Sequence, residues 1–224
     1  MRFYEKEYIE LKTSIAEMGI IAANMNHDAI KSLVNSNTEL AIETIEKDKE
    51  IDKLDIRIEE LCMKILALFE PKAIDLRYIL SASRIIVDLE RIGDYCVNIC
   101  HEVIRLSKPG NELSIKPFAE IQTMCSISTA MTRDVIKAYF DQDVKLANSI
   151  IQEDDIIDKL HDQILTDLIT KQGEQAVEGI LRLMVICRSL ERIADHAVNI
   201  AEMVHFMVTG INIRHNHQLG INNE

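Results

Sequence analysis

The sequence predicts an all-α protein whose six long helices form two tandem three-helix bundles. Three observations carry this prediction: helical periodicity of apolar residues, few helix-breaking residues, and an internal repeat. The 224 residues include only 7 Gly and 3 Pro, and aromatic residues make up 4%. A β-sandwich or barrel of this length needs more turns, and therefore more Gly and Pro, than this chain contains. Hydrophobic residues, at 47%, suffice for a packed core.

Turn-forming residues separate the first three predicted helices. Asn35, Ser36 and Asn37 form a polar turn signal after the first helix. Pro71 can open the third helix, because proline is tolerated in a first turn but disfavours a helical residue before it. We therefore expect helices over residues 4–34, 37–69 and 72–107.

The strongest break in the chain lies at Lys108, Pro109 and Gly110, where the first bundle should end. Further along, Gly173 is a plausible C-cap for the fifth helix. The remaining helices are expected over residues 113–140, 142–171 and 174–208. This division predicts a first bundle over 1–108, a second bundle over 109–210 and a flexible tail over 211–224.

The internal repeat relates the two halves. Residues 88–99 (DLERIGDYCVNI) match residues 189–200 (SLERIADHAVNI), and residues 51–54 and 157–160 both read IDKL. The matching segments occur in the same order in each half. The chain is therefore predicted to hold two copies of one three-helix unit, in which short connections make consecutive helices antiparallel neighbours.

The charge and the apolar runs limit the protein's surroundings and partners. The net charge is −12, from 37 acidic and 25 basic residues. This balance argues against non-specific nucleic-acid binding and against charge-driven docking on an anionic membrane, and it suits cations or a cationic partner. No apolar run approaches the roughly 18 residues that span a bilayer. Because residues 1–10 are also charged and the five cysteines include no CxxC pair, we expect a cytoplasmic protein.

Acidic residues recur in pairs four positions apart, so that each pair lies on one helix face. An antiparallel hairpin about Pro71, or about the turn just past Gly173, brings two such pairs to the same height. Four carboxylates should then converge beside the core of each bundle. These eight candidate metal ligands are Asp48, Asp52, Glu90, Asp94, Asp154, Asp158, Glu191 and Asp195.

Converging carboxylates repel one another by about 1 kcal/mol per close pair near a solvated surface, so a compensating charge is expected. Hard cations with oxygen ligands are the natural candidates, and we predict Fe, Zn, Mn or Mg, with Ca also compatible. Seven residues beyond the third-helix pairs, His101 and Glu202 could add outer ligands. The alternative is a solvated acidic face. Its local partners would be Arg91, Arg192, Lys53 and Lys159.

Other reactive residues carry less information. Cys96 and Cys100 are interpreted as buried thiols that fill gaps in the core. His215 and His217 could bind a metal, but a frayed tail is the favoured interpretation. No Ser or Cys forms a triad pattern with a His, and no Gly-rich phosphate loop is present, so we predict a protein that is not an enzyme.

The repeated motifs resemble those of the PhoU family. The resemblance rests on ERIGD at 90–94 and ERIADH at 191–196, each leading into Val-Asn-Ile. The segment PKAIDLR at 71–77, Met18-Gly19 and the two IDKL segments also fit, so the match covers roughly residues 5–208. Ala194 replaces the family's Gly in the second motif. Cys100-His101 stands where the second repeat has Ala201-Glu202, which puts outer ligation of the first site in question.

This resemblance implies two three-helix bundles with metal clusters held by the D/ExxxD pairs. It also implies a regulatory role: restraint of phosphate uptake through a phosphate ABC transporter ATPase, and of starvation signalling through a sensor histidine kinase. Such proteins are cytoplasmic, approach the membrane only through these partners and commonly form homo-oligomers, so a homodimer or other homo-oligomer is expected.

Two other classes of function stay open. A carboxylate-bridged di-iron enzyme is one, although its Glu-x-x-His motifs have only Asp158-x-x-His161 as a near fit here. The other is a helical scaffold, or an accessory protein of a low-affinity phosphate or cation transporter.

Overall fold

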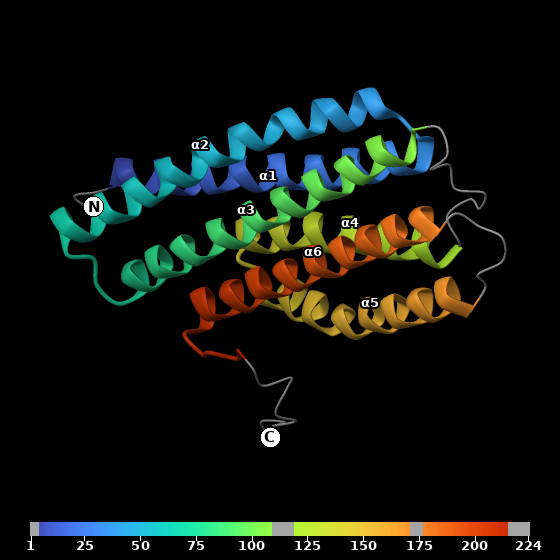
Figure 1. Cartoon of the computed structure of the whole chain (residues 1–224). Helices are drawn as coiled ribbons and strands as arrows, with labels where there is room; N and C mark the ends of the chain where they lie inside the picture. The colour runs from blue at the N-terminus through green and yellow to red at the C-terminus, as the bar shows by residue number, and fades with distance from the viewer. Residues whose placement is uncertain (1–4, 109–118, 171–176, 215–224) are drawn as a thin grey trace, which may run out of the picture.

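The computed structural model describes residues 5–108, 119–170 and 177–214, and these residues form six helices and no strand. The all-α prediction is confirmed. The helices are α1 (Glu5–Asn35), α2 (Thr38–Phe69), α3 (Ile74–Leu106), α4 (Ala119–Asp141), α5 (Val144–Thr170) and α6 (Val177–Thr209). Figure 1 shows α1, α2 and α3 as one bundle and α4, α5 and α6 as a second bundle beside it.

The helix boundaries follow local backbone chemistry. The Asn37 side chain caps α2 by accepting a hydrogen bond from the Leu40 amide at 3.0 Å. The third helix begins at Ile74, later than the expected residue 72, because Ala73 has a positive φ of 50°. The fifth begins at Val144 and not at residue 142, because Gln142 is left-handed with φ 52°. The predicted starts at 113 and 174, the predicted end at 171 and the Gly173 cap lie outside the described residues.

One apolar core runs through both bundles. It includes the fully buried Ile51 and Ile92 of the first bundle and the fully buried Ile157 and Ile193 of the second. The bundles meet along a seam where α3 packs on α6 and α1 packs on α4. The repeat units are therefore not separate globules, because each covers the apolar face of the other.

Polar contacts fix how α3 lies on α6. The Asp88 Oδ1 atom lies 2.8 Å from His196 Nδ1 and accepts a second hydrogen bond from Asn199 Nδ2 at 3.1 Å. Farther along the seam, Arg182 donates to Glu102 at 2.9 Å. Residue numbers rise along α3 as they fall along α6, so the two helices are antiparallel. No helix within the described ranges is both long enough and apolar enough to cross a membrane.

Candidate metal centres

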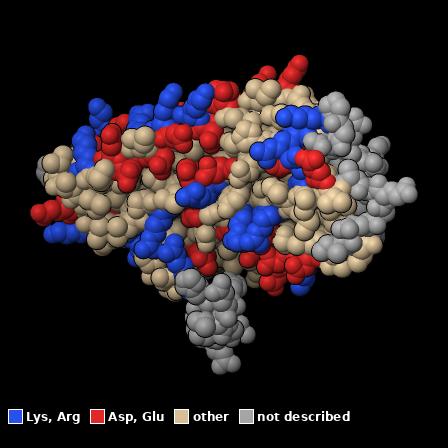
Figure 2. Space-filling view, viewed as in Figure 1, with Lys and Arg blue, Asp and Glu red and all other residues tan. Residues whose placement is uncertain are grey.

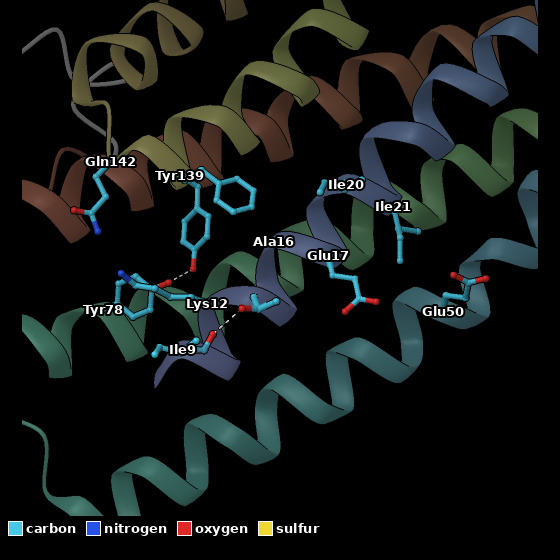
Figure 3. Close-up of a pocket in the computed structure, with 12 residues that line it drawn as sticks. Ile9, Lys12, Ala16, Glu17, Ile20, Ile21, Glu50, Tyr78, Tyr139 and Gln142 are labelled. Atoms are coloured by element: carbon cyan, nitrogen blue, oxygen red, sulfur yellow. Dashed lines mark hydrogen bonds between the residues drawn. The ribbon is translucent and has the colours of Figure 1, made fainter. Parts of the chain in front are cut away.

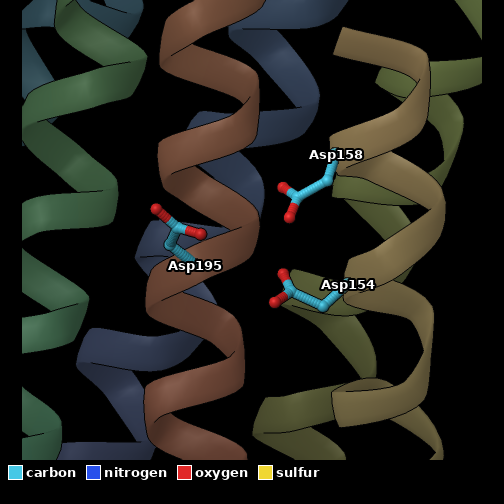
Figure 4. Close-up of side chains that lie close together, drawn as sticks. All are labelled: Asp154, Asp158 and Asp195. Atoms are coloured by element: carbon cyan, nitrogen blue, oxygen red, sulfur yellow. The ribbon is translucent and has the colours of Figure 1, made fainter. Parts of the chain in front are cut away.

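The second bundle gathers three of the predicted ligands. Asp154 and Asp158 lie one turn apart on α5, and Asp195 faces them from α6 (Figure 4). One carboxylate oxygen of each residue lies within 4.8 Å of those of the other two. These three residues and Glu191 are called the second centre below. The antiparallel α5–α6 pair places residues of the two D/ExxxD motifs side by side, as the hairpin argument predicts.

Burial and the charges of neighbouring carboxylates raise the pKa values of acids in the second centre. Burial raises the pKa of Asp154 to about 6, and the charges of Asp158 and Asp195 add to this effect. Burial also raises the pKa of Asp158, again with a contribution from Asp195. The Oδ1 atom of Asp154 is buried and has no hydrogen-bond partner among the described residues. Since buried polar atoms are normally satisfied, a cation at this point would supply the missing contact.

Glu191, the fourth predicted ligand of this centre, lies beside the other three and contacts an arginine. Burial and then the charge of Asp195 raise its pKa, whereas Arg188 and His161 lower it. The Arg188 guanidinium lies 3.0 Å from its carboxylate. The Glu191 carboxylate thus interacts with the other acids of the second centre and also with Arg188 on its own helix.

The first bundle holds the equivalent centre, formed by Asp48, Asp52, Glu90 and Asp94. Burial raises the pKa of Asp48, and Asp52 and Asp94 raise it further. Burial and then Asp94 raise the pKa of Glu90. The four carboxylates of the first centre therefore repel one another, but their oxygen atoms are less closely gathered than those of the second centre. Among the described residues, the only trio of potential ligands within 4.8 Å belongs to the second centre.

Gly93 explains how α2 approaches α3 at the first centre. A Cβ atom built at Gly93 would lie 3.0 Å from Asp48 Oδ1 and 3.0 Å from Ile51 Cδ1. The missing side chain lets the Asp48 carboxylate reach the surface of α3. This residue stands between Glu90 and Asp94 in the motif, so a close contact between the two helices falls at the acidic pair.

Arginines also contact these acids. Arg91 lies 3.0 Å from Asp94, and Arg192 lies 2.8 Å from Asp195. Arg91 and Arg192 are two of the four local partners that a solvated acidic face was expected to have, and both contact an acid of a centre. All the arginines involved lie at least partly exposed, where an ion pair contributes about 0–1 kcal/mol. In Figure 2, acidic side chains gather over α2 and over α5, with basic side chains among and between them.

Two side chains that the sequence argument did not place in the centres lie next to them. Asp55, three residues after Asp52, is half-buried and acts electrostatically on Glu90. His161, three residues after Asp158, is buried and acts on Glu191 and Asp158. The repeat itself could have pointed to these two positions, because the residue that follows IDKL is Asp55 in one copy and His161 in the other.

The predicted outer ligands have different surroundings. Glu202 lines a cavity of about 480 Å³ together with Asp154, Asp195 and His196. His101, its counterpart in the first half, is exposed. Cys96 and Cys100 are buried as predicted, and burial raises the pKa of the Cys100 thiol to about 12. His215 and His217 lie outside the described residues.

A larger cavity, of about 790 Å³, lies along α1 near the seam (Figure 3). Its walls include Ile9, Ile20 and Phe140, and Tyr78 and Tyr139 hydrogen-bond to each other at its floor. The described residues that line it include none of the eight predicted ligands. The candidate metal ligands are therefore separate from this apolar cavity.

Fold and site together define a class: an all-helical tandem-repeat protein with a carboxylate centre in each repeat. A family model described as the PhoU domain matches this chain twice, over residues 15–103 and 121–204. The chain therefore belongs to the PhoU family, as its motifs indicated.

Similar proteins span nearly the whole chain. The phosphate-specific transport system accessory protein PhoU homolog of Zymomonas mobilis is 37% identical over 94% of this chain and 88% of its own length. The PhoU protein of Escherichia coli is 30% identical over 95% of this chain and 88% of its own length. The crystal structure of PhoU from Pseudomonas aeruginosa superposes with a TM-score of 0.89 at 33% identity, covering 93% of this chain and all of that one.

Proposed function

We propose that this protein is a metal-binding regulatory adaptor that restrains phosphate uptake and phosphate-starvation signalling. The observation that carries the proposal is the extent of the similarity. Relatives named as accessory proteins of phosphate-specific transport systems match about 94% of this chain and most of their own length. A match of this extent includes both repeats and both acidic centres.

The partners in this proposal are the ATPase of a phosphate ABC transporter and a phosphate-sensing histidine kinase. An accessory protein of a transport system acts where the transporter's soluble parts lie, so the proposed location is the cytoplasm, with contact to the membrane only through these partners. A homodimer is the proposed assembly. The net charge of −12 gives no support to a nucleic-acid partner.

The proposed cofactors are metal cations, one or more at each centre, with Fe, Zn, Mn or Mg as the candidates. Supporting this, each centre offers four carboxylates whose mutual repulsion a cation would relieve. Asp154 supports it further, with its raised pKa and its unsatisfied buried oxygen. A bound cation would fix the α2–α3 and α5–α6 pairs in one relative position, giving a partner a defined surface to recognise.

Binding without turnover is favoured over a di-iron enzyme. In that class, ligands from four helices point into the bundle core. Here each centre draws on two helices, and Asp52 and Asp158 are exposed at the bundle surface. The relatives' names also favour a phosphate-specific transport system over a low-affinity phosphate or cation transporter.

The regulatory proposal is tested by deleting the gene. In phosphate-rich medium, alkaline phosphatase and transporter expression should rise in the deletion strain and return to normal on complementation. Pull-down from phosphate-replete cells should recover the transporter ATPase and the histidine kinase. Normal repression in the deletion strain, together with no interaction with either partner, would contradict the proposal.

The metal proposal is tested separately on purified protein. Replacing Asp154 and Asp195 by Asn should empty the second centre only, and replacing Glu90 and Asp94 by Gln and Asn the first only. Metal content after loading is the measurement. Glu43→Gln, at an exposed acid of α2 outside both centres, is the matched control. Unchanged metal content in both double variants would mean that the centres are solvated acidic faces.

A further inference from the structure

We propose that the cavity along α1 binds an amphipathic monocarboxylate of the fatty-acid type, with its carboxylate beside Lys12 and its chain along the seam between α1 and α4. The inference goes beyond the proposed regulatory function and does not depend on the metal centres. It rests on the shape of the cavity, on a cation without an acidic partner, and on a buried pair of hydroxyl groups at the cavity floor.

The cavity has the size and lining of a small-molecule site. Its volume of about 790 Å³ falls within the roughly 300–1,000 Å³ of such sites, which are mostly apolar with a few polar groups. Ile9, Ile20 and Phe140 line it and are 58%, 52% and 51% exposed. Single exposed apolar side chains are ordinary, but three that line one cavity form a surface that an apolar ligand would cover.

The lining extends along one helix, which favours a chain over a compact ring system. The α1 residues that line the cavity run from Ile9 to Ile21, which is about 18 Å at the helical rise of 1.5 Å per residue. Phe140 of α4 and Tyr78 of α3 also line it. A chain bound along α1 would therefore contact both bundles.

Lys12 brings to the cavity a positive charge that no acid neutralises. Its ammonium group lies 5.0 Å from the centre of the Tyr8 ring and 5.1 Å from that of the Tyr78 ring. Among the described residues it forms no ion pair. The two ring faces hold the ammonium group in place but leave its charge uncompensated, so it can still bind an anion.

Tyr78 and Tyr139 supply a second polar group at the same end of the cavity. They are 3% and 5% exposed, and their hydroxyl groups hydrogen-bond to each other and to no other described residue (Figure 3). Two hydroxyl groups carry two protons, and the bond between them uses one. The other buried proton lacks an acceptor, and a carboxylate at the cavity floor would accept it.

The acids that line the cavity determine which way the ligand lies. Glu17 and Glu50 lie apart from the tyrosine pair (Figure 3). They would repel an anionic head group, which therefore belongs beside Lys12, with the chain running toward Ile20. One cation balances one negative charge, so a monocarboxylate fits, whereas a phosphate dianion would leave one charge uncompensated.

The experiment measures binding of dodecanoate to the full-length protein by isothermal titration calorimetry at pH 8, below the concentration at which dodecanoate forms micelles. Dodecanol, with the same chain and a neutral head group, should bind at least about tenfold more weakly, because it lacks the charge-assisted hydrogen bond to the ammonium group. Dodecyl phosphate, a dianion at this pH, should also bind more weakly than dodecanoate.

Three variants locate the site. Lys12→Met keeps the apolar stem and removes the charge, so it should weaken dodecanoate binding about tenfold and leave dodecanol binding unchanged. Phe140→Asp, at a half-exposed side chain, should weaken the binding of both probes because it places a charge in the apolar wall. Lys145→Met, at an exposed lysine of α5 outside the cavity, is the matched control and should change nothing. Circular dichroism verifies that each variant is folded.

A second measurement reports the position of the chain. In ¹³C spectra of isoleucine methyl groups, the signals of Ile9 and Ile20 should shift when dodecanoate is added, and that of Ile156, exposed on α5, should not.

The proposal is overturned if dodecanoate does not bind, or if Lys12→Met keeps the parent affinity while the Ile9 and Ile20 signals stay in place. Equal binding of dodecanoate and dodecanol, or tighter binding of dodecyl phosphate, would overturn the assignment of a carboxylate head group. The deletion strain and the metal-content measurements judge the proposed function separately, because none of these variants alters a candidate metal ligand.

Discussion

The two acidic centres share a plan but differ in the residues that surround the shared carboxylates. In the first, Gly93 lets Asp48 come close to α3, whereas Ala194 occupies the same motif position in the second. The second has His161 in place of Asp55, and it brings one oxygen atom of each of three candidate ligands within 4.8 Å of the others. Duplication has kept the D/ExxxD pairs, and the positions beside them have changed. The centres are therefore two related sites of different geometry and donor chemistry.

The largest expected effect comes from truncating a core residue, and it tests whether the two halves contribute equally to stability. Ile92 and Ile193 are equivalent in the repeat and both fully buried. Replacing either by Ala should destabilise the protein by about 2–5 kcal/mol, because each leaves a cavity. Since one core spans both bundles, both variants should shift the same single transition in denaturant unfolding followed by circular dichroism. Two transitions, with each variant moving only one, would show that the halves unfold independently.

At the seam between the bundles, equivalent residues of the two halves should contribute unequally to stability. Asp88→Ala removes the acceptor shared by His196 and Asn199. Because these two donors are only partly buried, the loss should be about 1 kcal/mol, the low end of the penalty for an unsatisfied buried group. The equivalent residue, Ser189, donates to the Val185 carbonyl of its own helix and to no other described residue. Ser189→Ala should therefore cost clearly less. Urea unfolding of the two variants gives the comparison, and equal losses would mean that the seam contact adds nothing.

Acid should stabilise the metal-free second centre. The pKa of Asp154 is raised from 3.8 to about 6, so the folded state holds a proton that the unfolded chain has lost. Its contribution is thus fully present below about pH 4 and is lost as the pH rises through about 6. Asp154→Asn should remove this part of the pH dependence in thermal unfolding with chelator present. Asp48→Asn is the matched variant of the first centre. If Asp154→Asn and the parent protein show the same pH profile, Asp154 is not buried as described.

The smallest effect concerns the helix approach at the motif glycine. Gly93→Ala gains about 1 kcal/mol of helix propensity but adds a methyl group that presses on Asp48 and Ile51, so the net change should lie within about 1 kcal/mol. Ala194→Gly has no such compensation and should cost about 1 kcal/mol. Thermal unfolding measures both. If Gly93→Ala lowers the free energy of unfolding by more than about 2 kcal/mol, α2 cannot shift to make room for the added methyl group.

Much of this architecture could be predicted from the sequence, because helix periodicity, turn residues and the repeat are local signals. The spacing of Glu90 and Asp94 and the hairpin about Pro71 sufficed to bring the acids to one height. The burial of His161 could not be predicted from a pattern of four-residue spacings, since it depends on which turn of α5 faces α6. The Asp88–His196 contact was missed for a similar reason, because it joins bundles that no short connection relates.

The antiparallel pairing of α3 with α6 also bears on how such a chain could arise. Tyr95 and His196 are the same position of the repeat, and their rings stack at 5.7 Å across the seam. A position meets its own equivalent only on a two-fold axis, as in a symmetric pair of identical chains. A half-length ancestor would have completed this core by self-association, with a stability that depended on its concentration. Fusion of two copies removes that dependence. It also lets Asp88 on one side face His196 on the other without a mirrored partner, an asymmetry that identical chains could not have.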